Sequence, residues 1–299
     1  MSDTTITVVG GGLQRLDAFV RTALPELSRR VARLAIAEGA VRVNGRRAHK
    51  GTFVKPGDQV TLPAAARLVA EPDLPVSVLY EDAWVVVVDK PGGVRSHALD
   101  PRERGTVASF VLGRYPETVT VGDGLAAGLV HRLDQGTSGV LVAARSAVAF
   151  VALRAAFRRR AVQKQYLALV SGAPAATAHV RTPLAHDPSD RRRMIAARPG
   201  LRSWPAETQV ERLAVRGEHA LVRATMSTGV THQIRAHLAL LGHPVVGDRL
   251  YGAASSPLPD GRHGLHACSI AFPHPRGDHA LEVQSDLPDD LARLLDDAN

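Results

Sequence analysis

The order of strand-like and helix-like segments after residue 76 constrains the fold more than any other feature of the chain. Short runs rich in β-branched residues follow one another there, in places without a helix between them, whereas neighbouring parallel strands need a crossover, usually a helix. The order therefore favours a mixed α+β domain with a largely antiparallel sheet over a doubly wound parallel one. The predicted strands are Val85–Val88, Val140–Ala143, Tyr166–Val170, Thr208–Leu213 and Ala220–Thr225, and the predicted helices are Val148–Phe157, His232–Leu241 and an amphipathic one within Asp286–Asn299.

A second, smaller α+β module is predicted ahead of this domain, over residues 13–62. Apolar residues recur there at helical spacing, Ser28 stands where the N-cap of a second helix belongs, and Gly39 follows as its stop. Asn44-Gly45 is the strongest short signal for a hairpin turn. Residues 63–76 contain three prolines and few large apolar side chains, so they predict a flexible linker to a domain over residues 77–299.

The positive charge of the chain is concentrated in its first fifth. The whole chain carries 37 Lys and Arg against 29 Asp and Glu, a formal net charge of +8, and residues 1–62 hold ten basic and five acidic side chains. Such an excess favours a polyanionic partner, although a basic surface that only keeps a protein soluble is the alternative. The candidate contacts to that partner are Arg29, Arg30, Arg33, Arg46 and Lys50, on a helix face and a hairpin of the module.

The single cysteine and the N-terminal sequence narrow the class of protein. Cys268 has no partner for an internal disulfide and cannot supply a cysteine cluster for zinc, so a reducing compartment, the cytoplasm, is expected. The first residues lack a basic stretch followed by an apolar one, and no apolar run is long enough for a membrane span, so no membrane partner is expected. His232 and His237 do not share one helical face, and no metal site is expected.

The densest polar cluster within an apolar frame lies at residues 128–142. Two short apolar runs bracket a loop with three glycines, which predicts a strand–turn–strand scaffold that holds His131, Arg132 and Asp134. An aspartate in a glycine-rich turn is more often a turn former than a catalytic group. The loop alone therefore leaves a structural and a catalytic interpretation open.

A second polar cluster covers residues 227–237. Helical spacing puts Arg235 in the first turn of a buried helix that Thr231 would cap and Gly242 would end. A buried arginine needs an anionic partner, because an unpaired buried charge is costly. Asp134 is the expected partner.

Residues 13–62 resemble the S4 RNA-binding domain. The resemblance is carried by Arg15-Leu16-Asp17, Leu27-Ser28-Arg29, Glu38 to Gly45, and Gly57 to Val60. It implies binding of structured RNA through the helix and hairpin that carry the five cations named above.

The sequence from Val130 to Asp134, followed by Thr137-Ser138-Gly139, matches the HRLD-x-x-TSG signature of the RluA-type pseudouridine synthase family, which is highly specific at this length. Further blocks of the family occur in the right order across roughly residues 78–287. They include Tyr80 to Asp82, Asp89 to Gly93, Lys164 to Val170, Gly229 to His237, Gly242 to Asp248, and Leu265 to Ala267. Together with the S4-like module, the chain is similar to the S4-bearing members that act on large ribosomal RNA.

This resemblance implies an isomerase that detaches uracil from C1′ of a uridine in structured RNA, rotates it and rejoins it through C5 without a cofactor. Asp134 matches the family's catalytic aspartate, which either attacks C1′ or removes the C2′ proton. Arg235 matches the arginine that pairs with it, and Tyr166 the tyrosine that stacks on the base. The resemblance further implies substrate or RNA contacts for Arg132, His131, Ile234, Lys90, Arg191, Arg192 and Arg193.

Two departures from the family pattern concern substrate positioning. Val230 stands where members commonly carry arginine, and Arg95-Ser96 replaces an apolar–His-Pro continuation. A catalytically idle RNA-binding or ribosome-assembly protein is one alternative function, and the same activity on transfer RNA is another. An RNA glycosidase or nuclease is disfavoured, because a glycosidase of the usual kind needs two carboxylates and only Asp134 lies in a signature. We expect a monomer, because the S4-like module and the catalytic cleft together suffice to bind RNA.

Overall fold

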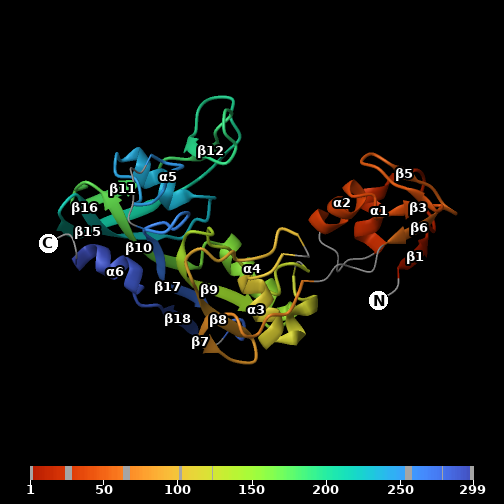
Figure 1. Cartoon of the computed structure of the whole chain (residues 1–299), viewed down its shortest axis with the longest axis horizontal. Coiled ribbons are helices and arrows are strands. Elements are labelled where there is room, and N and C mark those ends of the chain that lie inside the picture. Colours follow the sequence, from red (N-terminus) through yellow and green to blue (C-terminus); the bar gives the residue numbers. More distant parts are fainter. Residues whose placement is uncertain are drawn as a thin grey trace. The chain divides into compact units, whose positions relative to one another are not determined.

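The computed structural model describes residues 3–23, 29–62, 68–100, 103–122, 124–252, 258–277 and 279–296 (Figure 1). The chain divides into two compact units. The first comprises Met1–Leu74 and His97–Leu129, and the second comprises Pro75–Ser96 and Val130–Asn299. The domain bounds 13–62, 63–76 and 77–299 stay a prediction.

The first unit begins with a small antiparallel sheet and two helices. Helices α1 (Leu16–Ala23) and α2 (Arg29–Ala37) share one core with the strands. The predicted helix, helix and hairpin are confirmed, whereas Ser28 lies outside the described residues. In the sheet, β1 (Thr4–Thr7), β6 (Gln59–Leu62), β3 (Arg42–Val43) and β4 (Arg46–Arg47) are neighbours in that order, and β2 (Gln14–Arg15) pairs separately with β5 (Phe53–Val54). Buried residues of the core include Leu16, Val20, Ile36, Val41 and Val60.

Local turn chemistry accounts for the hairpin and for the end of α2. Asn44 and Gly45 take φ values of 50° and 77°, the left-handed values that a two-residue type I′ turn requires. Strands β3 and β4 pair on either side of this turn. Gly39 takes a φ of 68° after the last turn of α2, and its N–H donates to the Ile36 carbonyl. Both predicted turns are confirmed.

The first unit also contains helix α3 (Val107–Arg114) and the short 3-10 helix η1 (Pro116–Thr120). The Thr106 hydroxyl caps α3 by accepting the Ser109 N–H at 3.1 Å. The Glu71 N–H donates to the Ser109 carbonyl at 2.9 Å, and its carboxylate accepts the Gly105 N–H at 2.7 Å. Helix α3 is not among the elements predicted from the sequence, because five consecutive residues of this helix are buried and leave no amphipathic period to detect.

Nine of the described strands form the sheet of the second unit. Their order begins β11-β15-β16-β10 and continues β17-β9-β8-β7, while β18 pairs with β17. Each pair is antiparallel except β17 with β9, so the predicted mixed, largely antiparallel α+β fold is confirmed. The strands are β7 (Ser77–Glu81), β8 (Val85–Lys90), β9 (Ser138–Ala144), β10 (Gln163–Ser171), β11 (Thr177–Val180), β15 (Thr208–Arg216), β16 (His219–Met226), β17 (Leu265–Pro273) and β18 (Ala280–Gln284).

Helices α4 (Ala147–Arg158) and α5 (Gln233–Leu240) confirm two of the predicted helices. The prediction that Thr231 caps α5 is wrong. His232 occupies the N-cap position with a φ of 54° and makes no side-chain cap bond. The Gln233 side chain holds this end of the helix instead, because its Oε1 accepts the Val230 N–H and its Nε2 donates to the Thr208 hydroxyl.

Helix α6 (Asp289–Asp296) is the predicted amphipathic helix at the end of the chain. Leu291 is fully buried in a cluster with Leu169 and Val246, and Leu287, Leu294 and Leu295 pack against that cluster. A second, three-stranded sheet consists of β12 (Leu184–His186), β13 (Met194–Ala196) and β14 (Ser203–Trp204). None of the helices in the described part of the chain has the length and apolar character of a membrane span.

Candidate active site

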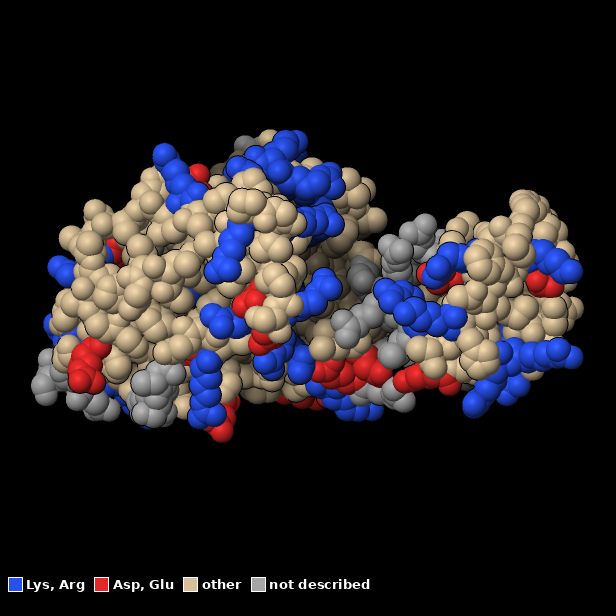
Figure 2. All heavy atoms as spheres, turned by 90° about the horizontal axis from the view of Figure 1, so that it is seen from above, with Lys and Arg blue, Asp and Glu red and all other residues tan. Residues whose placement is uncertain are grey.

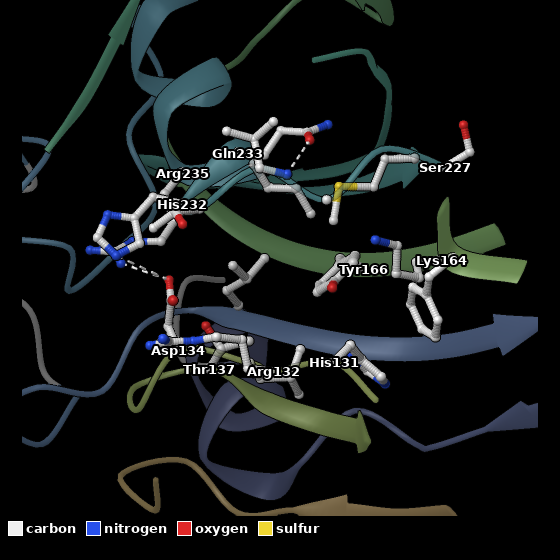
Figure 3. A pocket seen from close by; sticks show the side chains of 18 of the residues that line it. His131, Arg132, Asp134, Thr137, Lys164, Tyr166, Ser227, His232, Gln233 and Arg235 are labelled. Carbon is white, nitrogen blue, oxygen red and sulfur yellow. Dashed lines mark hydrogen bonds and ion pairs between the residues drawn. The ribbon is translucent and has the colours of Figure 1, made fainter. Parts of the chain in front are cut away.

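A pocket of about 380 Å³ lies in the second unit, where the loop ahead of β9 faces β10, the end of β16 and α5 (Figure 3). The loop contributes Asp134, strand β10 contributes Tyr166, and helix α5 contributes Arg235. Asp134 is the only carboxylate among the described residues that line this pocket. The two polar clusters that the sequence singled out therefore meet at one site.

The loop that carries Asp134 departs from the predicted strand–turn–strand scaffold. Strand β9 follows it, but the described residues immediately ahead of it form no extended strand. Val142 in β9 holds the loop instead. Its carbonyl accepts the Val130 N–H and its N–H donates to Nε2 of His131, both at 3.1 Å. Ser96 adds a further contact, because its hydroxyl donates to the Leu133 carbonyl and accepts the Leu133 N–H.

Two buried cations hold the loop just beyond Asp134. The Lys90 ammonium donates to the Gln135 carbonyl at 3.1 Å and also to the carbonyls of Pro91 and Val94. Arg262 donates through Nη1 to the Gly136 carbonyl at 2.9 Å, while its Nε binds the Asp290 carboxylate of α6. These contacts fix the backbone on the C-terminal side of Asp134.

The prediction that Lys90 contacts RNA is wrong. Its side chain is 0% exposed and its three N–H groups have three carbonyl acceptors, so no donor remains for a ligand. Burial, with repulsion from Arg262, lowers its pKa to about 7. Lys90 is a structural residue of the loop.

Arg235 lies between two carboxylates. Its Nη1 donates to Oδ2 of Asp134 at 2.7 Å, as predicted, and its Nη2 donates to Oδ1 of Asp248 at 2.8 Å. Its Nε also donates to Oδ2 of Asp248. The Asp248 side chain is completely buried and that of Arg235 is 5% exposed, whereas that of Asp134 is 20% exposed. Asp134 is thus the carboxylate of the three-residue network that reaches the pocket.

The electrostatics of the network keep Asp134 ionised. Burial on its own raises the pKa of the Asp134 carboxyl, but attraction to His232 and Arg235 outweighs burial and holds the pKa below its ordinary value. Burial also lowers the pKa of His232, so this imidazole attracts the carboxylate only at acid pH, where it is protonated, and at pH 7 Arg235 supplies the positive charge. Burial opposes the charge of Arg235 as well, yet its bonds to Asp248 and Asp134 raise its pKa. A carboxylate at this place can act as a base or a nucleophile at neutral pH.

Tyr166 and Ile234 form part of the apolar lining of the pocket. Tyr166 is 6% exposed on β10, and Ile234 is 3% exposed on α5. Burial and the Asp134 charge raise the pKa of Tyr166, so its hydroxyl stays protonated. A flat, uncharged ring next to a carboxylate offers a surface on which a planar base can stack.

His131 and Arg132 also line the pocket but differ in environment. The His131 ring stacks on Phe157 at 5.1 Å between ring centroids. Burial, with repulsion from Lys164 and Arg154, lowers the pKa of His131 to about 3, so the ring is neutral. Arg132 is exposed.

Arg191, Arg192 and Arg193 lie in the loop that joins β12 to β13, and they are not among the lining residues of the pocket. The Arg192 guanidinium binds the Asp190 carboxylate at 2.7 Å on the surface. The Arg193 guanidinium lies over the ring of Tyr251 at 5.7 Å. Their proposed contact with RNA stays a prediction.

The predicted cations of the N-terminal module belong to the first unit. Arg33, Arg46 and Lys50 are exposed, whereas the side chains of Arg29 and Arg30 lie outside the described residues. Arg33 and Lys50 line a second pocket, of about 660 Å³, together with Arg15 and His49. Figure 2 shows Lys and Arg side chains spread over the visible face of the molecule.

Three residues of the pocket or of the Asp134 network received no site role from the sequence. Asp248 was quoted only as part of a family block, and nothing in its local sequence signals a bond to Arg235. Lys164 lines the pocket from β10 and Arg158 from the end of α4. The alternation along β10 was the available signal for Lys164, because it puts residues 164 and 166 on one face. Among the described residues, no group of three potential metal ligands lies close enough to hold an ion.

Comparison with known proteins identifies the family. The RNA pseudouridylate synthase model matches residues 84–240, and the S4 domain model matches residues 14–60. An uncharacterized RNA pseudouridine synthase of Chloroflexus aurantiacus is 40% identical over 291 residues, covering 94% of this chain and 89% of the relative. A ribosomal large subunit pseudouridine synthase D of Xylella fastidiosa is 36% identical over 308 residues, covering 96% of this chain and 89% of that relative.

A solved structure agrees with these matches. Human RNA pseudouridylate synthase domain containing 1 is similar with a TM-score of 0.61 and 28% identity, covering 75% of this chain and 88% of that one. The family predicted from the HRLD-x-x-TSG signature and the S4 resemblance are both confirmed. The chain therefore belongs to the RNA pseudouridylate synthase family, as an isomerase that acts on RNA and carries an S4 domain in its N-terminal part.

Proposed function

We propose that this chain converts specific uridines of large-subunit ribosomal RNA to pseudouridine, with Asp134 as the reacting carboxylate. The observation that carries the proposal is the ion pair of this side chain: Asp134 is bound to Arg235 at 2.7 Å and is the only carboxylate among the described lining residues. A single carboxylate suits an isomerisation, whereas hydrolysis of a glycosidic bond ordinarily uses a pair.

The reaction is balanced without a co-reactant. The C1′–N1 bond of uridine breaks, the uracil turns, and C5 bonds to C1′ while the proton that C5 loses is matched by one that N1 gains. The Asp134 carboxylate either attacks C1′ or removes the C2′ proton, and both steps need its ionised form. Arg235 supports either step, because its positive charge favours that form.

The detached uracil needs a surface that keeps it in the pocket while it turns. The buried ring of Tyr166 and the apolar side chain of Ile234 can provide this surface without a charge that would fix one orientation. We therefore assign Tyr166 to stacking on the base. Its protonated hydroxyl adds no competing negative charge beside Asp134.

A uridine within structured RNA must leave its base stack before it reaches Asp134. Arg132 is exposed at the pocket and can contact the RNA as the nucleotide enters. The exposed cations Arg33, Arg46 and Lys50 on the S4 domain can contact phosphates elsewhere on the same RNA. Relatives named as ribosomal large subunit pseudouridine synthases support ribosomal over transfer RNA as the target. We further propose that the enzyme acts as a monomer in the cytoplasm, since pocket and S4 domain lie in one chain whose single cysteine suits a reducing compartment.

The test is Asp134→Asn, a substitution that keeps the size of the side chain and removes its charge. We expect it to abolish pseudouridine formation in large-subunit ribosomal RNA from a strain that lacks this enzyme, measured by pseudouridine mapping. RNA binding should stay nearly intact. Asp260→Asn is the matched control, because that carboxylate is 85% exposed and pairs with Arg249 on the surface.

Turnover by Asp134→Asn near the wild-type rate would contradict the assignment of the reacting carboxylate. Mapping pseudouridines in total RNA from the same strain tests the target. Loss of sites in transfer RNA alone, with ribosomal RNA unchanged, would replace ribosomal by transfer RNA as substrate.

A further inference from the structure

Lys164 is a buried cation in the pocket that neither the Asp134 network nor the stacking surface uses. It lies on β10, two residues before Tyr166, and is 7% exposed. Its ammonium donates to the Thr228 carbonyl at 2.7 Å and lies 5.9 Å from the centre of the Phe157 ring. No carboxylate of the described residues lies within ion-pair distance of it. An ammonium has three N–H donors, and two of them remain for a ligand.

Helix α4, whose Phe157 ring lies beside Lys164, adds further positive charge to the pocket lining. Arg154 and Arg158 lie one helical turn apart on α4 and both line the pocket. Arg154 donates to the Val130 carbonyl, and Arg158 has no carboxylate partner among the described residues. Asp134, the one described carboxylate of the lining, is already bound to Arg235. The Lys164 end of the pocket is therefore cationic, and the described lining residues supply no counter-ion to it.

Figure 3 shows the order of the side chains along the pocket. Asp134 and Arg235 lie at one end, Tyr166 in the middle, and Lys164 at the other. Ser227 and Gly229 next to Lys164 are exposed, and a Cβ added to Gly229 would meet the ammonium nitrogen at 3.4 Å. The Lys164 nitrogen thus lies just beneath the exposed Ser227 and Gly229 at the rim of the pocket.

We propose that Lys164, assisted by Arg158, binds a phosphate of the RNA backbone beside the nucleotide that occupies the pocket. The proposal rests on the function proposed above and assigns a subsite to it. A phosphate oxygen is anionic, matches the donor-only ammonium and guanidinium groups, and supplies the counter-charge that this end lacks. Burial lowers the pKa of Lys164 to about 8, so the ammonium is still charged at pH 7.

A different ligand and a purely structural role both explain the surroundings of the Lys164 ammonium less well than a phosphate does. A uracil carbonyl could accept one hydrogen bond from Lys164, but it is neutral and leaves Arg158 without an anion. The Thr228 carbonyl alone would make Lys164 a purely structural link between β10 and the turn after β16. That link uses one donor and explains neither the further cations nor their exposure to the pocket.

The first experiment compares Lys164→Met, Lys164→Arg and the surface control Arg216→Met on transcribed large-subunit ribosomal RNA. Arg216 lies at the hairpin end of β15, outside the pocket lining, so its substitution should leave kcat/KM unchanged. Lys164→Met should lower kcat/KM by about tenfold to a hundredfold, the usual loss of a charge-assisted hydrogen bond. It should also reduce the slope of log affinity against log salt by about 0.7 to 0.9, the value for one lost phosphate contact. Lys164→Arg should restore most of kcat/KM and most of the salt slope.

The second experiment identifies the contacted group on a short RNA that carries a mapped uridine. One methylphosphonate linkage is placed on its 5′ side or on its 3′ side, which removes a single phosphate charge. With one of the two linkages, the kcat/KM of the wild type should fall by the same factor as the kcat/KM of Lys164→Met falls on unmodified RNA. The kcat/KM of Lys164→Met should be the same on the RNA with that linkage as on unmodified RNA.

The outcomes separate this proposal from the function on which it rests. Wild-type enzyme that forms no pseudouridine would overturn the proposed function. If the wild type is active, but the loss caused by Lys164→Met and the loss caused by the methylphosphonate add for the 5′ linkage and for the 3′ linkage alike, the phosphate subsite is overturned. A purely structural role of Lys164 predicts this additivity, together with an unchanged salt slope. If Lys164→Met and one of the linkages cause equal losses of kcat/KM, and the two losses do not add when they are combined, the subsite is supported.

Discussion

Asp248 binds Arg235 with both of its carboxylate oxygens, at the Nε and Nη2 atoms of the guanidinium. Asp248 is completely buried, and the remaining terminal nitrogen of Arg235 is the one that donates to Asp134. The guanidinium therefore has a fixed orientation before any substrate enters, because a two-oxygen contact leaves it no freedom to turn. Asp248 is in this sense a positioning residue for Asp134.

The substitution Asp248→Asn tests this relationship. It keeps the shape but leaves the buried guanidinium with a single carboxylate, and we expect a loss of about 3 kcal/mol in the free energy of unfolding, the cost of breaking a buried pair. The rate of pseudouridine formation should fall as well, since Arg235 can then rotate. Urea unfolding and single-turnover rates are the measurements. The exposed Asp260→Asn should cost less than about 1 kcal/mol, and an equal cost for both variants would argue against a special role of Asp248.

The sequence predicted one half of this network and not the other. A buried arginine needs an anion, and this general argument was enough to pair Arg235 with Asp134. The choice of Asp248 as the second partner depends on how the chain returns after α5, through the turn in which the Asp248 N–H donates to the Val245 carbonyl. No periodic pattern encodes such a return.

A second prediction concerns the pH dependence of Arg235→Gln. In the wild type the pKa of Asp134 lies below its ordinary value, so kcat/KM should stay constant down to about pH 4. Burial by itself raises this pKa, and without Arg235 it is opposed less. The proposed reaction needs the ionised carboxylate, so the activity of the variant is lost as the pH falls through the now higher pKa of Asp134. The acid limb of the variant's single-turnover profile should therefore lie at higher pH, and an unmoved limb would show that Arg235 does not set the ionisation.

Local sequence patterns predicted the elements well, but they could not predict burial or long-range pairing. Asn44-Gly45 and Gly39 marked turns because the φ values they adopt are properties of single residues. Lys90 was misassigned because its sequence does not reveal the three carbonyls that surround it. The parallel pairing of β17 with β9 likewise joins residues 266 and 138, which only the completed sheet brings together.

A third prediction concerns Gly136, two residues after Asp134. A Cβ at this position would lie 2.1 Å from the Gly261 carbonyl oxygen and 2.9 Å from the His263 ring, so the loop must move to accept it. Gly136→Ala should cost about 1–3 kcal/mol of stability and lower the rate of pseudouridine formation, because Asp134 moves with the loop. Gly12→Ala is the control, since a Cβ there meets no atom within 4 Å. The measurements are the thermal unfolding and the activity of the two variants. A fully active Gly136→Ala would show that the loop tolerates the shift.

The last prediction concerns the S4 domain and is made with point substitutions, so that the fold is kept. Arg33, Arg46 and Lys50 are exposed, and their joint replacement by Gln removes three charges without opening the core. If each contacts one phosphate, the slope of log affinity for the ribosomal RNA against log salt should fall by about 0.7 to 0.9 per residue. The rate at saturating RNA should stay unchanged, because none of the three lines the pocket that contains Asp134. An unchanged slope would mean that the cations of this domain do not hold the RNA, whereas a lower saturated rate would mean that they also help to place the uridine.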